Sequence, residues 1–329
     1  MAIHTTNNRT SVFYSKIMLF GEYSIILGSM GLTIPYAHFN GELGFINKNR
    51  YTDLDFARHS NRQLADYYRY LLELENNHQL PEGFSLQQMA REIDEGLYFE
   101  STIPEGYGLG SSGALVAAIY HRYSKKTSRS KLNGHGEEIA TLKKEVAILE
   151  SYFHGTSSGI DPLICYLKNP LLLKDQKAIS PVEIPRYDLH PGDAIFLVNS
   201  GKTGKTAPLV QQFIHDCEHP AFYSLMASQY IPINNQCIET LTQGNLEAFF
   251  PVLEELSHFQ LHHFQRMIPA NIEADWHYGL KSRKYTLKLC GSGGGGFVLG
   301  FTHDYEGVEK QFSAKGLEVI PVYQAEKPD

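Results

Sequence analysis

The sequence contains few cysteines, and none of them lies at a spacing typical of a metal or disulfide framework. Four cysteines are spread over 329 residues without a CxxC pair, so neither a disulfide scaffold nor a zinc site is indicated. We expect reduced thiols, as in an intracellular protein. The four are Cys165, Cys217, Cys237 and Cys290.

Long apolar runs and an excess of positive charge are also missing. No stretch approaches the roughly 18 apolar residues that a membrane span requires, and residues 1–10 are polar where a signal peptide would be apolar. The 36 Asp and Glu residues outnumber the 29 Lys and Arg residues, giving a net charge of -7. This balance argues against nucleic acid or an anionic membrane as the main partner. We therefore predict a cytoplasmic protein.

Enough apolar sequence is present for a full core, since 42% of the residues are hydrophobic and 12% are aromatic. A chain of this length is expected to fold as two domains. Strand-like and helical patterns mix throughout, which predicts an α+β or α/β class. The expected strands are 11–20, 31–39, 95–103, 194–200 and 317–323, and the expected helices include 62–77, 111–123 and 137–153.

A proline-rich stretch at 168–192 predicts the boundary between the two domains. We place it at residue 185, with an N-terminal domain over 1–185 and a C-terminal domain over 186–329.

The segment IPEGYGLGSSGAL at 103–115 combines glycines and serines just before an apolar run that starts a helix. The first amides of a helix have no partner within it, and they can bind an anion such as phosphate. Ser111 and Ser112 could cap the helix or could turn a hydroxyl toward a phosphate or its magnesium. The alternative is an ordinary capped loop, because the segment matches neither the Walker pattern nor GxGxxG.

Two further clusters carry polar or glycine-rich sequence. SSGIDPL at 157–163 follows a helical stretch that ends with Glu150 and His154. Taken alone, Asp161 in this cluster is more typical of a turn residue or helix cap than of a catalytic base. CGSGGGGFVLGF at 290–301 holds four consecutive glycines, which indicates a backbone that lies against a ligand or another loop.

The three glycine-containing motifs at 15–28, 103–115 and 290–301 resemble, in order and spacing, those of the GHMP kinases. This family includes galactokinase, homoserine kinase, mevalonate kinase and phosphomevalonate kinase. Within it, ESYFHGTSSGIDPLICY at 150–166 and NSGKTGKTAPLV at 199–210 are most similar to the mevalonate kinases. The resemblance implies transfer of the γ-phosphate of ATP to an alcohol.

The resemblance also implies roles for individual residues. Asp161 would take the proton of the acceptor hydroxyl, and Lys16 would lower the pKa of that hydroxyl and balance phosphate charge. Glu150 and Ser112, rather than Ser111, would hold Mg²⁺. The ATP phosphates would be bound by Gly106, Gly108, Leu109, Gly110, Ser111, Ser112 and Gly113. The substrate side would include Glu22, Tyr23, His154, Thr206, Gly293 and Gly294.

Each of these side chains has a simpler alternative role. Lys16 could be an edge lysine with a solvated head, Glu150 a solvated helix carboxylate, His154 a packed core histidine and Thr206 a helix cap. The basic run at 125–131 is most simply a solvated connection between helices.

The acceptor predicted first is (R)-mevalonate, giving 5-phosphomevalonate in isoprenoid biosynthesis. Most mevalonate kinases read G-E-H where this chain has Gly21, Glu22 and Tyr23, and a tyrosine there is more similar to phosphomevalonate kinase. The alternatives are therefore phosphomevalonate kinase or another GHMP sugar or alcohol kinase, then a mevalonate diphosphate decarboxylase or a non-catalytic binding member. A homodimer is compatible with the sequence.

The fold implied by the resemblance has two domains. The N-terminal domain would resemble domain 2 of ribosomal protein S5, with a left-handed βαβ crossover, and the C-terminal domain would be ferredoxin-like.

Overall fold

The computed structural model describes residues 11–47, 53–125, 136–174, 178–185, 190–204 and 206–325. Contacts divide the chain into two compact units. Unit 1 consists of Met1–Lys16, Pro35–Ile103 and Gly110–Lys168, and unit 2 consists of Ile17–Ile34, Pro104–Leu109 and Asn169–Asp329. The strands β1 (Phe13–Phe20) and β2 (Gly31–Phe45) contribute residues to both units.

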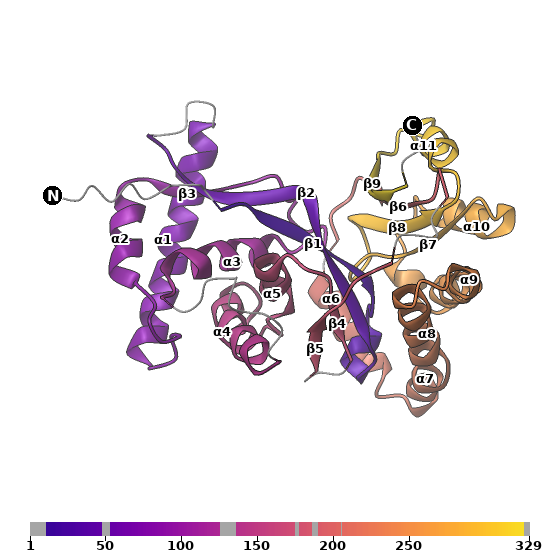
Figure 1. Ribbon diagram of the computed structural model, residues 1–329, viewed down its shortest axis with the longest axis horizontal. Coiled ribbons are helices and arrows are strands. Elements are labelled where there is room, and N and C mark those ends of the chain that lie inside the picture. The colour runs from indigo at the N-terminus through magenta and orange to yellow at the C-terminus, as the bar shows by residue number, and fades with distance from the viewer. Residues whose placement is uncertain are drawn as a thin grey trace. The chain divides into compact units, whose positions relative to one another are not determined.

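Unit 1 combines strand pairing with a group of helices. The C-terminal part of β2 pairs antiparallel with β3 (Leu97–Ser101), and α1 and α2 pack beside β3 (Figure 1). The Asp53 carboxylate caps α1 by accepting from the amide of Asp55 at 2.8 Å, which satisfies one of the free donors at the helix start. The helices are α1 (Leu54–Asn76), α2 (Leu86–Asp94), α3 (Ser111–Tyr123), α4 (Gly136–His154) and α5 (Ile160–Leu167).

The helix α3 is largely buried in unit 1. It packs against α4 and α5, and most of its residues are small or apolar and inaccessible to water. Such a helix is apolar on nearly all sides because its neighbours surround it. Its amino end, where the serines and glycines lie, is thereby held in a fixed position.

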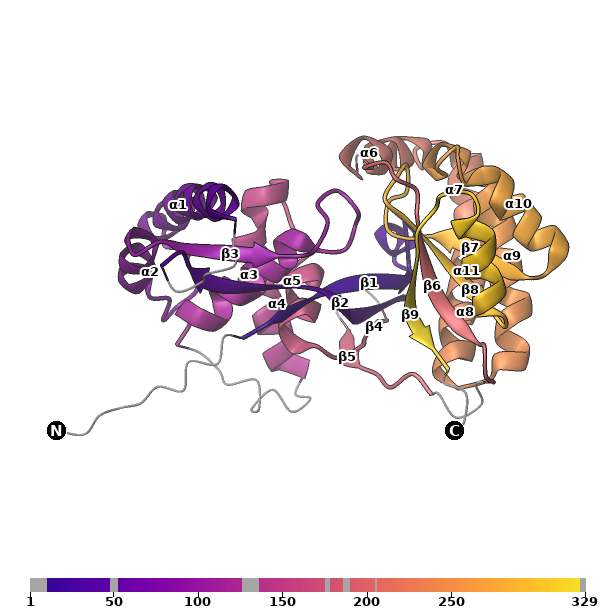
Figure 2. The ribbon, with the colours of Figure 1, turned by 90° about the horizontal axis from the view of Figure 1, so that it is seen from above.

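Unit 2 is organised around an antiparallel sheet with the strand order β7-β8-β6-β9. The helices α9 and α10 pack against β7, and α11 packs against β9 (Figure 2). The order of a strand, helices, two strands, a helix and a strand follows the βαββαβ pattern. The strands are β6 (Ala194–Asn199), β7 (Tyr285–Leu289), β8 (Phe297–Thr302) and β9 (Val319–Gln324).

The remaining elements of unit 2 are mostly helical. Its short strands β4 (Leu171–Leu173) and β5 (Ile179–Pro181) pair with each other, and β4 also pairs with the first residues of β2. The helices are η1 (Ser24–Leu27), α6 (Thr206–Asp216), α7 (Pro220–Leu225), the π-helical η3 (Met226–Tyr230), α8 (Ile231–Thr242), α9 (Leu246–His263), η4 (Gln265–Met267), α10 (Glu273–Ser282) and α11 (Tyr305–Ser313).

The predicted mixture of helices and strands is confirmed, and the helix expected at 111–123 has these bounds in α3. The chain passes from unit 1 to unit 2 for the last time at Lys168, where the proline-rich stretch begins. The boundary at residue 185 and the likeness of the N-terminal domain to ribosomal protein S5 stay predictions.

Candidate active site

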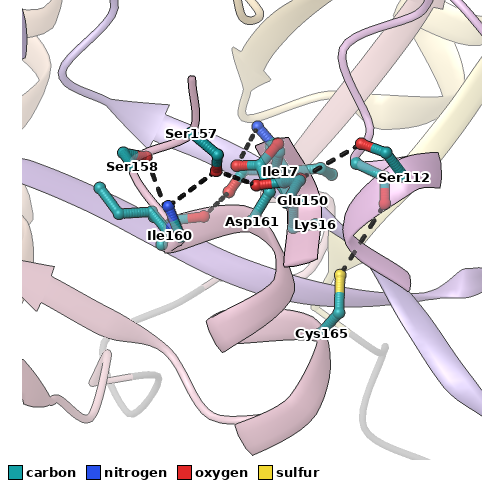
Figure 3. Close-up of polar contacts among 12 residues, drawn as sticks. Lys16, Ile17, Ser112, Glu150, Ser157, Ser158, Ile160, Asp161 and Cys165 are labelled. Atoms are coloured by element: carbon teal, nitrogen blue, oxygen red, sulfur yellow. Dashed lines mark hydrogen bonds and ion pairs between the residues drawn. The ribbon is translucent and has the colours of Figure 1, made fainter. Parts of the chain in front are cut away.

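An ion pair between Lys16 and Asp161 lies at the centre of the candidate site in unit 1 (Figure 3). The Lys16 Nζ lies 3.0 Å from Asp161 Oδ1, and the side chains are 9% and 33% exposed. The head of the lysine is therefore not solvated, so this part of the alternative interpretation is wrong, although β1 is the end strand of its sheet. The partly open carboxylate is accessible to a ligand, whereas its cationic partner is enclosed.

The start of α5 positions Asp161. Gly159 precedes this helix with φ 73°, in the left-handed region that glycine adopts without strain. Asp161 occupies the first turn, where the helix dipole favours a negative charge. It does not hold the N-cap position, because Gly159 does.

The amino end of α3 supplies the backbone around this ion pair. Gly110 is the N-cap residue at φ 77°, and no side chain caps the helix. A Cβ atom at Gly110 would lie 2.9 Å from Lys16 Cγ, so only glycine permits this approach. The predicted cap by Ser111 or Ser112 is therefore wrong, and the first amides of α3 keep the character of an anion site.

Ser112 turns its hydroxyl toward Glu150 instead. The Ser112 Oγ lies 3.2 Å from Glu150 Oε1 and 3.1 Å from His154 Nε2. His154 is exposed at the end of α4, so its interpretation as a packed core histidine is wrong. The contacts bring together three residues that were predicted from two separate motifs.

Glu150 is a buried carboxylate, with only 3% of the residue exposed, so it is not a solvated helix residue. Its Oε2 accepts a hydrogen bond from Ser157. Burial, and then the negative charge of Asp161, raise its pKa from 4.5 to about 7, although the two serine hydroxyls and Lys16 act in the opposite direction. Glu150 can therefore gain or lose a proton near neutral pH, and a bound cation would favour the deprotonated form.

Two residues beside the site were not predicted, namely Ser157 and Cys165. The Ser157 hydroxyl contacts Glu150, and the buried Cys165 thiol donates to the carbonyl of Gly110 at 3.9 Å. Burial and the charge of Asp161 raise the pKa of Cys165, so it stays a thiol. In the sequence, the only feature that could have indicated Ser157 was its position two residues before Gly159, the N-cap residue of α5.

The predicted residues Glu22 and Tyr23 lie in unit 2. The Glu22 carboxylate forms a buried ion pair with Lys288 at 2.5 Å. The Tyr23 hydroxyl donates to the carbonyl of Ser292 at 2.5 Å, and its ring packs against Phe213 and Phe264. Burial, and then the charge of Glu22, raise the pKa of Tyr23, so it stays a hydrogen-bond donor.

The glycine cluster after β7 packs closely against two other loops of unit 2. A Cβ atom at Gly296 would lie 3.0 Å from the Tyr107 backbone, and the Gly296 amide donates to the carbonyl of Lys202 at 2.5 Å. At Gly293, a Cβ atom would overlap the carbonyl of Met267. The loop that carries Gly106 and Gly108 is therefore supported by the glycine cluster within this unit.

Some predictions reach residues that are not fully described. Thr206 is the first residue of α6, but its side chain lies outside what the structure describes. The basic run at 125–131 lies outside the described residues except for Lys125.

Within the described residues, no group of three or more His, Cys, Asp and Glu side chains is arranged to hold a metal. Ser112 and Glu150 nevertheless supply adjacent oxygen donors, which suit magnesium. None of the described helices has the length and apolar composition needed to cross a membrane.

Residues 66–169 match the protein family described as "GHMP kinases N terminal domain". The matched range contains the candidate site residues on α3, α4 and α5.

Curated relatives also match part of the chain. The mevalonate kinase of Pyrococcus horikoshii is 27% identical over 221 residues, which cover 60% of this chain and 58% of the relative. That of Dictyostelium discoideum is 22% identical and covers 60% and 55%, respectively. The chain thus matches less than two thirds of the length of these relatives.

Solved structures share the fold over nearly the whole chain. L. major mevalonate kinase, in complex with R-mevalonate, has a TM-score of 0.61 at 16% identity and covers 97% of both chains. Methanococcus jannaschii mevalonate kinase has a TM-score of 0.63 at 17% identity, covering 96% of this chain and 98% of the other. Streptococcus pneumoniae phosphomevalonate kinase has a TM-score of 0.60 at 16% identity, covering 97% and 99%.

Proposed function

Because residues 66–169 match the GHMP kinase N-terminal domain family, we propose that the protein transfers the γ-phosphate of ATP to an alcohol, with (R)-mevalonate as the acceptor. The observation that carries the proposal is the Lys16–Asp161 ion pair at the amino end of α3, where Ser112 also contacts Glu150. Phosphoryl transfer needs a group that accepts a proton, positive charge near the phosphate and a site for the phosphate oxygens. These residues offer all three.

The amides at the start of α3 are the proposed phosphate site. Gly110, Ser111, Ser112 and Gly113 form the first turn and its N-cap, and no side chain caps this end of the helix. The helix dipole adds to the attraction for an anion. We propose that the preceding residues Gly106, Gly108 and Leu109 continue this site along the ATP phosphates.

Asp161 is the proposed base. Its carboxylate is partly exposed and is paired with an enclosed ammonium group, so it can accept the proton of an incoming hydroxyl. Lys16 lowers the pKa of that hydroxyl and balances the charge that develops on the transferred phosphate.

Ser112 and Glu150 fit Mg²⁺, since their oxygens are adjacent and one belongs to a carboxylate. When bound, Mg²⁺ neutralises charge on the phosphate oxygens. Glu150 has a pKa of about 7 in the protein without a ligand, so it can lose its proton readily when a cation binds. His154 would hold the Ser112 hydroxyl through its ring nitrogen.

Mevalonate is favoured over other acceptors because the segments at 150–166 and 199–210 resemble mevalonate kinases and the curated relatives carry this name. Glu22, Tyr23, His154, Thr206, Gly293 and Gly294 remain the proposed substrate side. Phosphomevalonate is the alternative acceptor, supported by Tyr23. We further propose a cytoplasmic location, in line with the expected reduced thiols.

The experiment that tests this function is a measurement of ADP release with ATP and Mg²⁺ and four separate acceptors. Mevalonate, phosphomevalonate, galactose and homoserine are compared at equal concentration. ADP release that depends on mevalonate is the expected result. Release with phosphomevalonate instead would favour the alternative, and carbon dioxide formed with mevalonate diphosphate would indicate a decarboxylase.

A further inference from the structure

The Ser157 hydroxyl connects the Glu150 carboxylate to the start of the helix that carries Asp161. It donates to Glu150 Oε2 and accepts a hydrogen bond from the amide of Gly159 at 2.9 Å (Figure 3). Gly159 is the N-cap residue of α5, the helix whose first turn carries Asp161. One hydroxyl therefore lies between the Glu150 carboxylate and the start of the helix that bears the proposed base.

The Glu150 carboxylate needs such a partner because it is enclosed. A buried carboxylate is costly unless donors satisfy its oxygens. Ser112 serves Oε1 and Ser157 serves Oε2. The two serines approach from different elements, since Ser112 lies on α3 and Ser157 lies in the loop between α4 and α5. Together they fix the plane of the carboxylate.

We propose that Ser157 is a positioning residue that orients Glu150 for its cation and ties this carboxylate to the start of α5. The inference rests on the proposed function, in which Glu150 and Ser112 hold Mg²⁺. Only a side chain that both donates and accepts can make the two bonds at once, and a hydroxyl does so. Alanine would lose both bonds, whereas threonine would keep the hydroxyl.

Ser158 provides a matched control in the same loop. Its hydroxyl accepts a long hydrogen bond of 3.4 Å from the amide of Ile160, so it makes the same kind of local turn as Ser157. The side chain is exposed, and the bond to Glu150 belongs to Ser157. Ser158→Ala therefore removes a loop hydroxyl without removing a donor to the carboxylate.

The test measures binding of Mn²⁺ in the presence of ADP, by electron paramagnetic resonance of the free ion, in the full-length protein. We expect Ser157→Ala to weaken Mn²⁺ binding by about tenfold or more, because a hydrogen bond to a charged group is lost. Ser157→Thr should stay within about threefold of the unsubstituted protein, and Ser158→Ala within about twofold. The Mg²⁺ concentration for half-maximal turnover should shift in the same order.

Equal Mn²⁺ affinity in Ser157→Ala and Ser158→Ala would overturn the inference. If Ser157→Ala does not fold, Ser157→Cys replaces it: its weaker donor should give an intermediate loss of affinity, and an unchanged affinity would overturn the inference. This readout needs no acceptor. A Mn²⁺ effect specific to Ser157 in a protein that phosphorylates none of the alcohols would thus uphold the inference while the proposed function fails.

Discussion

At the scale of single residues, Tyr23 shows where a motif and its tertiary surroundings give different information. The motif places this tyrosine on the substrate side. In unit 2, however, only 5% of the residue is exposed and its hydroxyl is bonded to the carbonyl of Ser292, 269 residues away in the sequence. No local pattern encodes a partner at that separation. The structure therefore suggests that Tyr23 also holds the glycine-rich loop.

Tyr23→Phe removes this hydroxyl while keeping the packed ring. We expect a loss of about 1 kcal/mol in the free energy of unfolding, measured with urea, because the Ser292 carbonyl loses its donor. Turnover should change by less than about threefold, as expected for a lost neutral hydrogen bond outside the reacting groups. Tyr223→Phe is the control, since Tyr223 is 50% exposed. A large loss of turnover without a loss of stability would instead assign the hydroxyl to the substrate.

The motifs predicted the charged residues of the site but missed two residues that make single contacts there. Lys16, Glu150 and Asp161 have charged groups in recognisable segments, and the structure brings all three together in unit 1. Ser157 and Cys165 act through single contacts to Glu150 and Gly110. Such contacts depend on the exact approach of two elements, which a sequence pattern does not specify.

At the scale of elements, the close approach of α3 and α5 positions Asp161. A Cβ atom at Gly113 would lie 2.7 Å from the Asp161 carbonyl carbon and 2.9 Å from Pro162 N. These are backbone atoms, so they cannot rotate away. Glycine is therefore required at this position by the short distance between the two helices. The backbone conformation of Gly113 does not require it, since its φ is not positive.

Gly113→Ala should therefore push the two helices apart. We expect a destabilisation of about 1–3 kcal/mol, as for other overpacked cores, together with a fall in turnover because Asp161 moves relative to Lys16. Ala118→Gly in the same helix is the control: it weakens the helix by about 1 kcal/mol but should preserve turnover in the folded protein. Equal turnover in the two variants would contradict this account of α3 and α5.

The elements that sequence patterns predicted are those with a clear period. The apolar run of α3 gave the correct bounds, whereas α1 begins at Leu54 rather than at residue 62 because its first turns are largely polar. The short helices α2 and α5 were not predicted. In α5, Asp161 was more typical of a turn or a helix cap, yet it lies in the first turn of the helix, and the missing amide of Pro162 costs little there.

At the scale of the whole molecule, the buried Glu150 should make stability depend on pH. Its pKa is raised from 4.5 to about 7, so the folded state binds this proton more tightly than the unfolded state does. The contribution to stability is therefore greatest below about pH 4.5 and is lost as the pH rises toward 7. Above that pH the enclosed charge is a net cost.

Glu150→Gln should remove this dependence. Without a divalent cation, the free energy of unfolding of the unsubstituted protein should fall relative to the variant by about 2 kcal/mol between pH 5.5 and pH 8. Urea unfolding at both pH values measures this difference. Parallel changes in the two proteins would show that Glu150 does not carry the shifted proton.

The division of the chain into units could not have been predicted in full. The loosened, proline-rich stretch after Lys168 coincides with the last passage between the units. The earlier passages lie within β1 and β2 and beside the glycine loop at Pro104–Leu109. The passages within β1 and β2 are not marked by a change in composition, because a strand that continues from one unit to the next keeps its pattern.

The most direct test of the account is the single-turnover formation of 5-phosphomevalonate from ATP and mevalonate by the unsubstituted protein and by Asp161→Asn. ATP binding, measured in parallel by calorimetry, serves as the control for folding. We predict that the variant binds ATP about as well but forms product at least about a hundredfold more slowly, because the base is lost. Product formation at nearly the original rate in Asp161→Asn would contradict the central claim.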